Sequence, residues 1–411
     1  MLKRLLFLVA FILVCILHSG AQTLLSVDEP RAERLFAMLL HNETDSLYAQ
    51  LNSEVKAALR HDQLEGTMRQ VETAVGAYLG HAVWQHERVA GTNVLTTLLR
   101  FERGRLKLVF AFDAQGLVSG LRLMPVPQES DEYIVPDGVV EIIDTVRTAP
   151  RVALPCVITL SAQPNPPMIV MVHGSGPLDR DETVMANHTF RDLAHQLALH
   201  GVCSLRYDKR TFVCQCPVDN MDDETVLDAM SAVSLACQYN NNVYLLGHSL
   251  GAMMAPIIAG RSDTLLRGIV MMAAPARDLL PIVREQVEYL HAATADTTDL
   301  QAMLELVTAK MQADSPHYLL PQGQVEAARK LSLPKLLLQG GRDYQVPPAE
   351  LELWRQALGE TEAVYRLYPS LNHLFLEGEG PSLPTEYQRS GVIHEQVVND
   401  IVEFVCSHRH N

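Results

Sequence analysis

Basic residues are scarce in this sequence. The 411 residues include 33 lysines and arginines against 48 aspartates and glutamates, which gives a formal net charge of −15. Nucleic-acid binding needs concentrated positive charge to neutralise phosphates, so we expect no nucleic-acid partner. Hydrophobic residues make up 48% of the chain, an ordinary share that excludes wholesale disorder. The length exceeds that of one average domain and favours at least two.

Cysteine is also scarce, because seven residues in so long a chain do not build a disulfide scaffold. Cys214 and Cys216 are too close in sequence to bridge each other easily. A disulfide from one of them to Cys203 or Cys237 stays open. Cys156 and Cys203 lie in strand-like apolar runs, which favours buried thiols at those two positions.

Metal-binding patterns are missing as well. No Cys/His cluster has zinc spacing and no carboxylate cluster has calcium spacing, so we expect neither a metal nor another cofactor. The glycine-rich turn at residues 173–177 lacks the spacing of the nucleotide-binding loops, which disfavours a phosphate cradle.

Long apolar runs are confined to the N-terminus. Lys3 and Arg4 precede an apolar run over residues 5–17, and small residues follow at 19–21. This pattern is typical of a secretory signal over residues 1–21, with export to the periplasm or the extracellular space. The alternative is an uncleaved anchor, but the run is short for a bilayer span of about 20 apolar residues. We expect no membrane association after cleavage.

The remaining chain divides into two domains with different patterns. Residues 22–125 read as a small α+β domain, with helical spacing over 29–80 and strand-like segments over 92–124. Residues 126–134 form a proline-containing linker. In residues 135–411 short apolar strands alternate with helices, which predicts an α/β fold with a mostly parallel sheet. A helical stretch over 278–330 interrupts the alternation and reads as a cap.

One pentapeptide carries the strongest chemical signal. Residues 247–251 read Gly-His-Ser-Leu-Gly, between an apolar strand at 243–246 and a helix that begins at Leu250. This is the strand–turn–helix context of a nucleophile elbow, in which the serine hydroxyl is exposed at the carboxyl end of the sheet. Ser249 is therefore the predicted nucleophile.

A serine nucleophile needs a base and an acid that orients the base. Asp343 follows a strand at 336–338, and His373 lies in a loop after a strand at 363–367. Both positions fall where parallel sheets build their sites, and the order Ser, Asp, His is the one this elbow requires. His248 stays open as a competing base. Weaker alternatives for the acid are Glu377 and Glu379.

The oxyanion of an acyl-transfer reaction needs two backbone donors. The N–H of Leu250, directly after the nucleophile, is one candidate. The N–H of Ser175, in the His-Gly-Ser-Gly-Pro turn after the strand at 168–172, is the other. The charged run at 179–182 reads either as a solvated loop or as a brace for this turn.

These segments resemble a known family. Residues 173–182, His-Gly-Ser-Gly-Pro-Leu-Asp-Arg-Asp-Glu, are similar to the HGSGP-x-DRDE signature of bacterial esterase-type hydrolases in the α/β-hydrolase superfamily. Further landmarks of that group occur at residues 206–210, 247–251, 340–347 and 372–375. The resemblance covers about 135–407, and residues 30–125 resemble a domain of unknown function that often precedes such hydrolases. Thr211 departs from the family's usual glycine, which puts substrate contacts of that loop in doubt.

The resemblance implies an α/β-hydrolase with a Ser249–His373–Asp343 triad. We expect an exported serine hydrolase that cleaves small-molecule carboxylic esters through an acyl-enzyme. Amide or peptide cleavage by the same triad stays open. So does a non-catalytic protein of this fold that only binds a ligand.

Overall fold

The computed structural model describes residues 29–407, except 60, 90–91, 103, 127–133, 149–151, 215–219, 263–265, 295–298, 315–318, 320–321 and 361. The chain divides into two compact units, Met1–Glu132 and Tyr133–Asn411. The predicted signal segment lies outside the described residues, as does most of the predicted linker. None of the described helices is long and apolar enough to cross a membrane.

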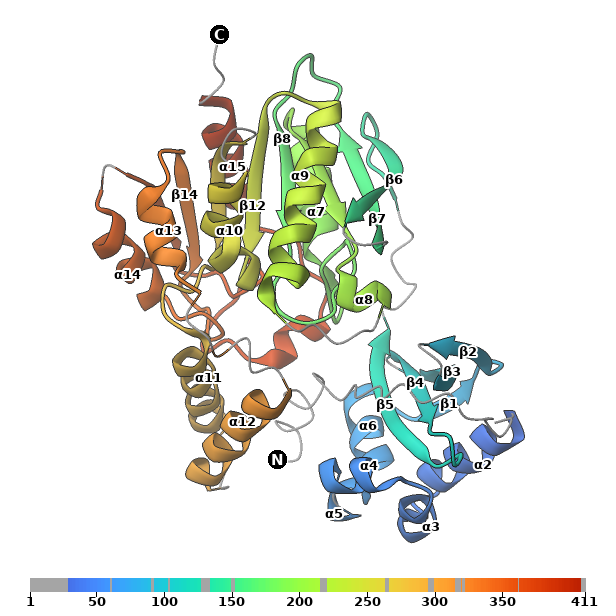
Figure 1. Cartoon of the computed structure of the whole chain (residues 1–411). Coiled ribbons are helices and arrows are strands. Elements are labelled where there is room, and N and C mark those ends of the chain that lie inside the picture. The colour runs from blue at the N-terminus through green and yellow to red at the C-terminus, as the bar shows by residue number, and fades with distance from the viewer. Residues whose placement is uncertain are drawn as a thin grey trace. The chain divides into compact units, whose positions relative to one another are not determined.

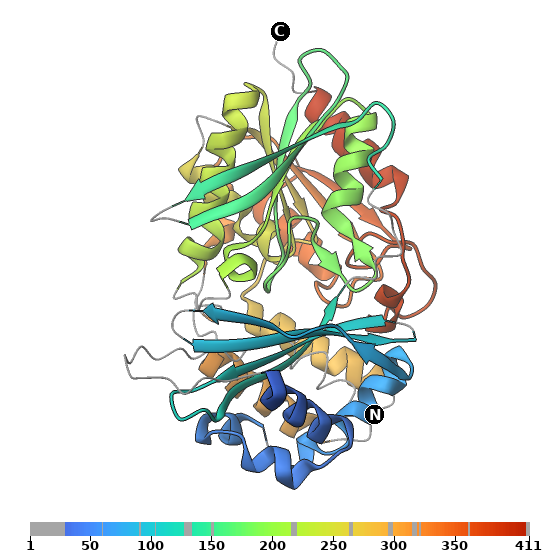
Figure 2. The same ribbon diagram turned by 90° about the vertical axis from the view of Figure 1, so that its right-hand side faces the viewer.

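The first unit places helices on one face of an antiparallel sheet (Figure 2). Its helices are α2 (Glu29–Leu40), α3 (Thr44–Ala49), α4 (Ser53–Ala58), α5 (His61–Leu64) and α6 (Thr67–Val75). Its strands are β1 (Tyr78–His81), β2 (Gln85–Val89), β3 (Thr92–Phe101), β4 (Gly104–Phe112) and β5 (Val118–Val126). The sheet order is β1-β3-β4-β5, and β2 also pairs with β3.

The core of this unit follows the two periodicities in its sequence. Helix α2 buries Leu35, Phe36 and Leu39, which share one stripe of the helix. Alternate residues of the strands, such as Leu108 and Phe110, face the same cluster. The predicted helical region ran to residue 80, whereas Tyr78–His81 form strand β1, and no element was predicted over β2. β1 and β2 are short strands that each pair with β3, and the β1 pairing carries a register shift. Neither strand shows the alternation of apolar and polar residues from which a strand is predicted in a sequence.

The second unit is built on an eight-stranded sheet of order β15-β14-β13-β12-β8-β11-β7-β6. The strands are β6 (Val140–Thr148), β7 (Val152–Leu160), β8 (Met168–Val172), β11 (Cys203–Tyr207), β12 (Val243–His248), β13 (Leu266–Met272), β14 (Lys335–Gly340) and β15 (Val364–Tyr368). The six strands from β15 to β11 are parallel, whereas β7 and β6 pair antiparallel at one edge. The predicted α/β class is confirmed, whereas the antiparallel pairing of β6 with β7 at the edge of the sheet was not predicted. A small separate pair joins β9 (Thr183–Val184) to β10 (Asn187–His188).

Helices cover both faces of the large sheet (Figure 1). The helical segments of this unit are α7 (Thr189–Leu199), α8 (Arg210–Cys214), the π-helical turn η1 (Asp222–Val226), α9 (Leu227–Tyr239), α10 (Leu250–Arg261), α11 (Leu279–Ala293), α12 (Leu300–Asp314), α13 (Gln324–Lys330), α14 (Ala349–Leu358), the 3-10 turn η3 (Pro384–Gln388) and α15 (Glu395–Ser407). In β8 every residue is buried, and alternate residues serve opposite cores. Val170 joins the cluster under α9 and α10, whereas Ile169 joins the cluster under α7 and α15.

The predicted cap over 278–330 is shorter in the structure. Helices α11 and α12 pack on each other and extend beyond the sheet (Figure 1). Helix α13 instead contributes the fully buried Ala328 to the sheet core, in the same cluster as Trp354. The cap therefore consists of α11 and α12, and α13 belongs to the layer that covers the sheet. Trp354 is fully buried and donates its Nε1–H to the carbonyl of Ala274 at 3.0 Å.

The cysteines of the described residues do not form the disulfide that the sequence left open. Cys203 and Cys237 are free thiols, as are Cys156 and Cys406. Cys156 and Cys203 are buried in β7 and β11, as their strand-like context predicted. Burial raises the pKa of the Cys156 thiol to about 12, so it is protonated and unreactive at neutral pH.

Candidate active site

The predicted site residues lie at one edge of the large sheet. Strands β8, β12, β14 and β15 run parallel, so their carboxyl ends share that edge. Ser249 follows β12, Asp343 and His373 follow β14 and β15, and the turn with Ser175 follows β8. In such sheets the carboxyl edge is where ligands bind, because loops there converge without side chains of the core between them.

Ser249 occupies a strained turn. Its backbone has φ 54° and ψ −116°, in a region that non-glycine residues rarely adopt, and its N–H donates to the carbonyl of Met272 at 2.9 Å. Such strain persists where the surrounding structure enforces it, which is common at active sites. The residue caps the N-terminus of α10, whose dipole favours negative charge at this position.

The two glycines of the pentapeptide make this turn sterically feasible. A Cβ at Gly247 would lie 2.2 Å from the carbonyl oxygen of Gly251, and a Cβ at Gly251 would lie 2.1 Å from the carbonyl oxygen of Val172. Both contacts are with backbone, which cannot move aside cheaply. Helix α10 therefore begins in direct contact with the end of β8, and this contact brings Ser249 against the turn that follows β8.

Replacement of Gly251 by Ala should for this reason destabilise the protein. The methyl group overlaps the Val172 carbonyl, and we expect a loss of about 3 kcal/mol or more in the free energy of unfolding. Urea unfolding followed by circular dichroism measures the change. Gly260, in the same helix, has open space around its Cβ position, so Gly260→Ala is the matched control and should not destabilise. Equal stabilities of the two variants would contradict the close contact.

Asp343 and His373 form a buried hydrogen bond. Nδ1 of His373 donates to Oδ2 of Asp343 at 2.7 Å, and both residues are at most 5% exposed. The other carboxylate oxygen accepts from the backbone N–H groups of Gln345 and Val346 at 2.8 and 2.9 Å. The carboxylate is thus fixed on both sides. It holds His373 in the tautomer that leaves Nε2 free to accept a proton.

His248, the competing base, is occupied at both ring nitrogens. Its Nε2 donates to the backbone carbonyl of His373 at 3.0 Å, and its Nδ1 lies 3.1 Å from a carboxylate oxygen of Glu182. The His248 and His373 rings pack with centroids 4.7 Å apart. His248 therefore supports the loop of His373 and has no nitrogen available for Ser249.

The turn after β8 lies against the nucleophile. A Cβ at Gly174 would lie 3.3 Å from Cβ of Ser249, so this backbone passes as closely as a glycine allows. The N–H of Gly174 donates to Oε1 of Glu182 at 2.8 Å. Among the described residues, the N–H groups of Ser175 and Leu250 donate to no protein acceptor, so both are available to a ligand. These are the two donors that the sequence analysis selected.

A buried charged pair lies behind this turn. Glu182 is 1% exposed and has the positive φ of 49°. Burial alone would raise the pKa of Glu182, but the neighbouring His248 outweighs it and lowers that pKa. Burial likewise opposes a charge on His248, yet Glu182 raises its pKa above the usual value. The two pKa shifts have opposite signs and a shared cause, the 3.1 Å approach of His248 Nδ1 to the Glu182 carboxylate, so each group favours the charged form of the other. His173, in contrast, has its pKa lowered by burial to about 4 and is neutral.

Of the charged run at 179–182, Glu182 braces the glycine-rich turn through the N–H of Gly174, whereas the other three residues pair with groups outside that turn. Asp179 accepts from the N–H of Thr183 at 2.9 Å, Arg180 pairs with Asp208 at 2.8 Å, and Asp181 pairs with the buried Arg206. The sequence signal for this was the run itself, four charged residues directly after a glycine-rich turn. Nothing in the sequence indicated that Glu182 would reach His248.

The cap contacts the loop that carries Asp343. The Tyr289 ring on α11 stacks on the Tyr344 ring beside Asp343, with centroids 5.3 Å apart, and Gln286 donates to the carbonyl of Gln345 at 2.6 Å.

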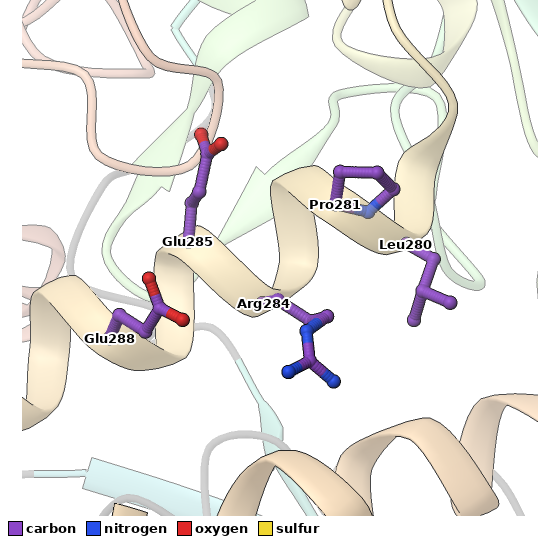
Figure 3. Close-up of a pocket in the computed structure, with 5 residues that line it drawn as sticks. All are labelled: Leu280, Pro281, Arg284, Glu285 and Glu288. Carbon is purple, nitrogen blue, oxygen red and sulfur yellow. The ribbon is translucent and has the colours of Figure 1, made fainter.

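Elsewhere along α11 a surface hollow of about 360 Å³ is lined by Leu280, Pro281, Arg284, Glu285 and Glu288 (Figure 3). Its lining comes from the cap helix alone and includes none of the predicted site residues. The described residues contain no group of His, Cys, Asp or Glu arranged to hold a metal ion.

The parallel sheet, the strained serine turn and the Asp–His pair at one edge together define a hydrolase of the α/β type. Residues 169–408 match the model of the alpha/beta hydrolase family, and residues 32–121 match a family described as a protein of unknown function, DUF3887. The chain belongs to the alpha/beta hydrolase family. The family resemblance inferred from the motifs is confirmed, as is a preceding domain of unknown function.

Several known proteins are similar to this chain. The chain is 32% identical over 397 residues to Esterase EstD of Thermotoga maritima, across 91% of this chain and 95% of the relative. The solved esterase Pf2001 of Pyrococcus furiosus has a TM-score of 0.46 at 14% identity, and covers 65% of this chain and 90% of its own. A brefeldin A esterase, described as a bacterial homologue of human hormone sensitive lipase, has a TM-score of 0.46 at 16% identity, with coverages of 68% and 79%.

Proposed function

We propose that this protein is an exported serine hydrolase that cleaves carboxylic esters with Ser249 as nucleophile, His373 as base and Asp343 as its orienting acid. The observation that carries the proposal is the buried 2.7 Å hydrogen bond between His373 and Asp343, at the same sheet edge as the strained Ser249. The identity to Esterase EstD supports the ester as the substrate class. The proposal of export depends on the signal-like pattern over residues 1–21.

The reaction follows from the roles of these groups. Oγ of Ser249 attacks the ester carbonyl carbon while Nε2 of His373 takes its proton. The resulting imidazolium is stabilised by the Asp343 carboxylate. The N–H groups of Ser175 and Leu250 stabilise the negative charge on the former carbonyl oxygen. Collapse expels the alcohol, which receives the proton from His373 and leaves an acyl group on Ser249.

Water then completes the cycle by the same steps. His373 removes a proton from water as it attacks the acyl carbon, and the second oxyanion occupies the same two donors. Collapse releases the carboxylic acid and returns the proton to Ser249. The acyl-enzyme is an ester of the serine, so its formation and its breakdown are chemically alike.

A matched pair of substrates tests the substrate class. We expect the purified protein to hydrolyse nitrophenyl butyrate with a burst of nitrophenol, and to hydrolyse the nitroanilide of the same acid far more slowly. The burst should approach one equivalent of protein if deacylation limits the rate. Preferential cleavage of the anilide would favour the amidase alternative. Failure to hydrolyse either compound, or to react with a fluorophosphonate, would favour a binding protein.

A further inference from the structure

Lys209 is a buried lysine that the proposed reaction does not use. It lies just beyond the carboxyl end of β11, next to β8 in the sheet, and is 2% exposed. Its own N–H donates to the carbonyl of Leu178 at 3.1 Å. Lysine is almost never this buried unless its ammonium group has partners. The partners of Lys209 therefore indicate what it does.

Two contacts fix the ammonium group. Nζ of Lys209 donates to the carbonyl oxygen of Gly174 at 2.8 Å and forms an ion pair with Oε1 of Glu224 at 3.1 Å. Glu224 is 3% exposed and lies on η1, so its carboxylate balances the buried charge. The remaining contact, with Gly174, brings a positive charge to the turn that lies against Ser249.

The Gly174 carbonyl and the Ser175 N–H belong to one peptide group. A trans peptide is planar, and its C=O and N–H point in opposite directions. Lys209 holds the carbonyl on one side of the turn, so the N–H of Ser175 must point to the other side. The N–H of Gly174, in the preceding peptide group, donates to Glu182 at 2.8 Å. The backbone is thus fixed on both sides of Gly174, which leaves the Gly174–Ser175 peptide little freedom to rotate.

The peptide between Gly174 and Ser175 needs contacts from other residues to fix its orientation. A Cβ at Gly174 would lie 3.3 Å from Cβ of Ser249, which is a tight contact, and glycine gives the backbone on both sides unusual conformational freedom. A donor that rotates out of line must be reoriented at the moment of reaction, whereas a fixed donor stabilises the oxyanion without that cost. An ammonium group on the carbonyl also polarises the amide, which makes its N–H a stronger donor.

We propose that Lys209 is a positioning residue of the oxyanion hole, which orients and polarises the peptide between Gly174 and Ser175. The inference rests on the proposed function, because an oxyanion forms only if Ser249 attacks an acyl group. Lys209 does not touch the substrate. Its effect should appear in the transition state and leave ground-state binding unchanged.

Replacement of Lys209 by Met tests this role, since Met keeps the apolar stem and removes the ammonium group. We expect kcat for nitrophenyl butyrate to fall roughly 10- to 100-fold, less than the loss of a whole oxyanion donor, while KM stays within about twofold. A trifluoromethyl ketone, which forms a tetrahedral oxyanion adduct on the serine, should bind more weakly by the same factor as kcat/KM falls. Inhibition by the butyrate product should be unchanged.

Lys335 supplies the matched control. It is a second buried lysine, at the amino end of β14, and its Nζ donates to the carbonyls of Leu331 and Leu333 at 2.8 and 3.1 Å. Lys335→Met should lower stability but leave kcat and ketone binding at the wild-type values. If Lys209→Met fails to fold because Glu224 loses its partner, the charge-balanced double variant Lys209→Met/Glu224→Gln replaces it under the same criteria.

The outcomes separate the two proposals. Wild-type kcat in the Lys209 variant, or a rise in KM with kcat unchanged, would overturn the positioning role. So would a fall in kcat that leaves the affinity for the ketone unchanged. If instead the wild-type protein does not hydrolyse esters, or Ser249→Ala retains the activity, the hydrolase proposal itself fails, and the positioning role of Lys209 fails with it.

Discussion

Replacement of Ser249 by Ala is expected to lower kcat for ester hydrolysis by about 10⁶-fold, because it removes the atom that attacks the substrate. The backbone donors and the binding site remain, so a small residual rate over water should persist. The measurement is the initial rate with nitrophenyl butyrate at high protein concentration. KM for any residual reaction should change little.

The fold should tolerate this substitution. Alanine has the same Cβ as serine at the strained backbone position, so the melting temperature should stay close to that of the wild type. Ser262, at the opposite end of α10, is the matched control, and Ser262→Ala should retain full activity. Residual activity above about 1% in Ser249→Ala could not arise from the donors and binding site alone, and it would contradict the assigned nucleophile.

Replacement of Asp343 by Asn should lower kcat by about 10⁴-fold, because it places the proton of His373 on the wrong ring nitrogen. One carboxylate oxygen accepts from the N–H groups of Gln345 and Val346, so the amide oxygen of Asn must occupy that side. Its NH₂ group then faces Nδ1 of His373 and forces that nitrogen to accept. The proton moves to Nε2, which can no longer take the proton of Ser249.

The pH dependence provides a second test of the same substitution. In Asp343→Asn the rate should become proportional to hydroxide concentration at high pH. Glu377, one of the weaker alternatives for the acid, supplies the control, and Glu377→Gln should retain activity. Loss of activity in the Glu377 variant together with normal activity in Asp343→Asn would reverse the assignment.

Local patterns in the sequence selected three residues, Ser249, Asp343 and His373, that the structure brings to one edge of the sheet. The strands that precede Ser249 and Asp343 contain continuous apolar runs at 243–246 and 336–338, because parallel strands covered on both faces have no polar side. The strand that precedes His373 lies at the edge of the sheet, includes Arg366 and is partly exposed. The flanking glycines are required by contacts with the backbone of Val172 and Gly251. Each of these signals lies within about a dozen residues of the site it predicts.

The supporting network could not be predicted in the same way. Glu182 and Lys209 lie in two separate loops and His248 ends strand β12, so their contacts arise only when β8, β11 and β12 become neighbours in the sheet. A lone buried lysine or glutamate carries no periodic signal. Similarly, α13 resembles the cap helices in sequence, and only its packing through Ala328 shows that it covers the sheet.

The central claim is that Ser249 is the nucleophile, and the most direct measurement is the site of labelling by a fluorophosphonate. After reaction, proteolysis and mass spectrometry should find the adduct on the peptide that contains Ser249, with one label per chain. Labelling should slow strongly in Asp343→Asn and disappear in Ser249→Ala. An adduct on any other residue, or equal labelling of the Ser249→Ala variant, would contradict the account.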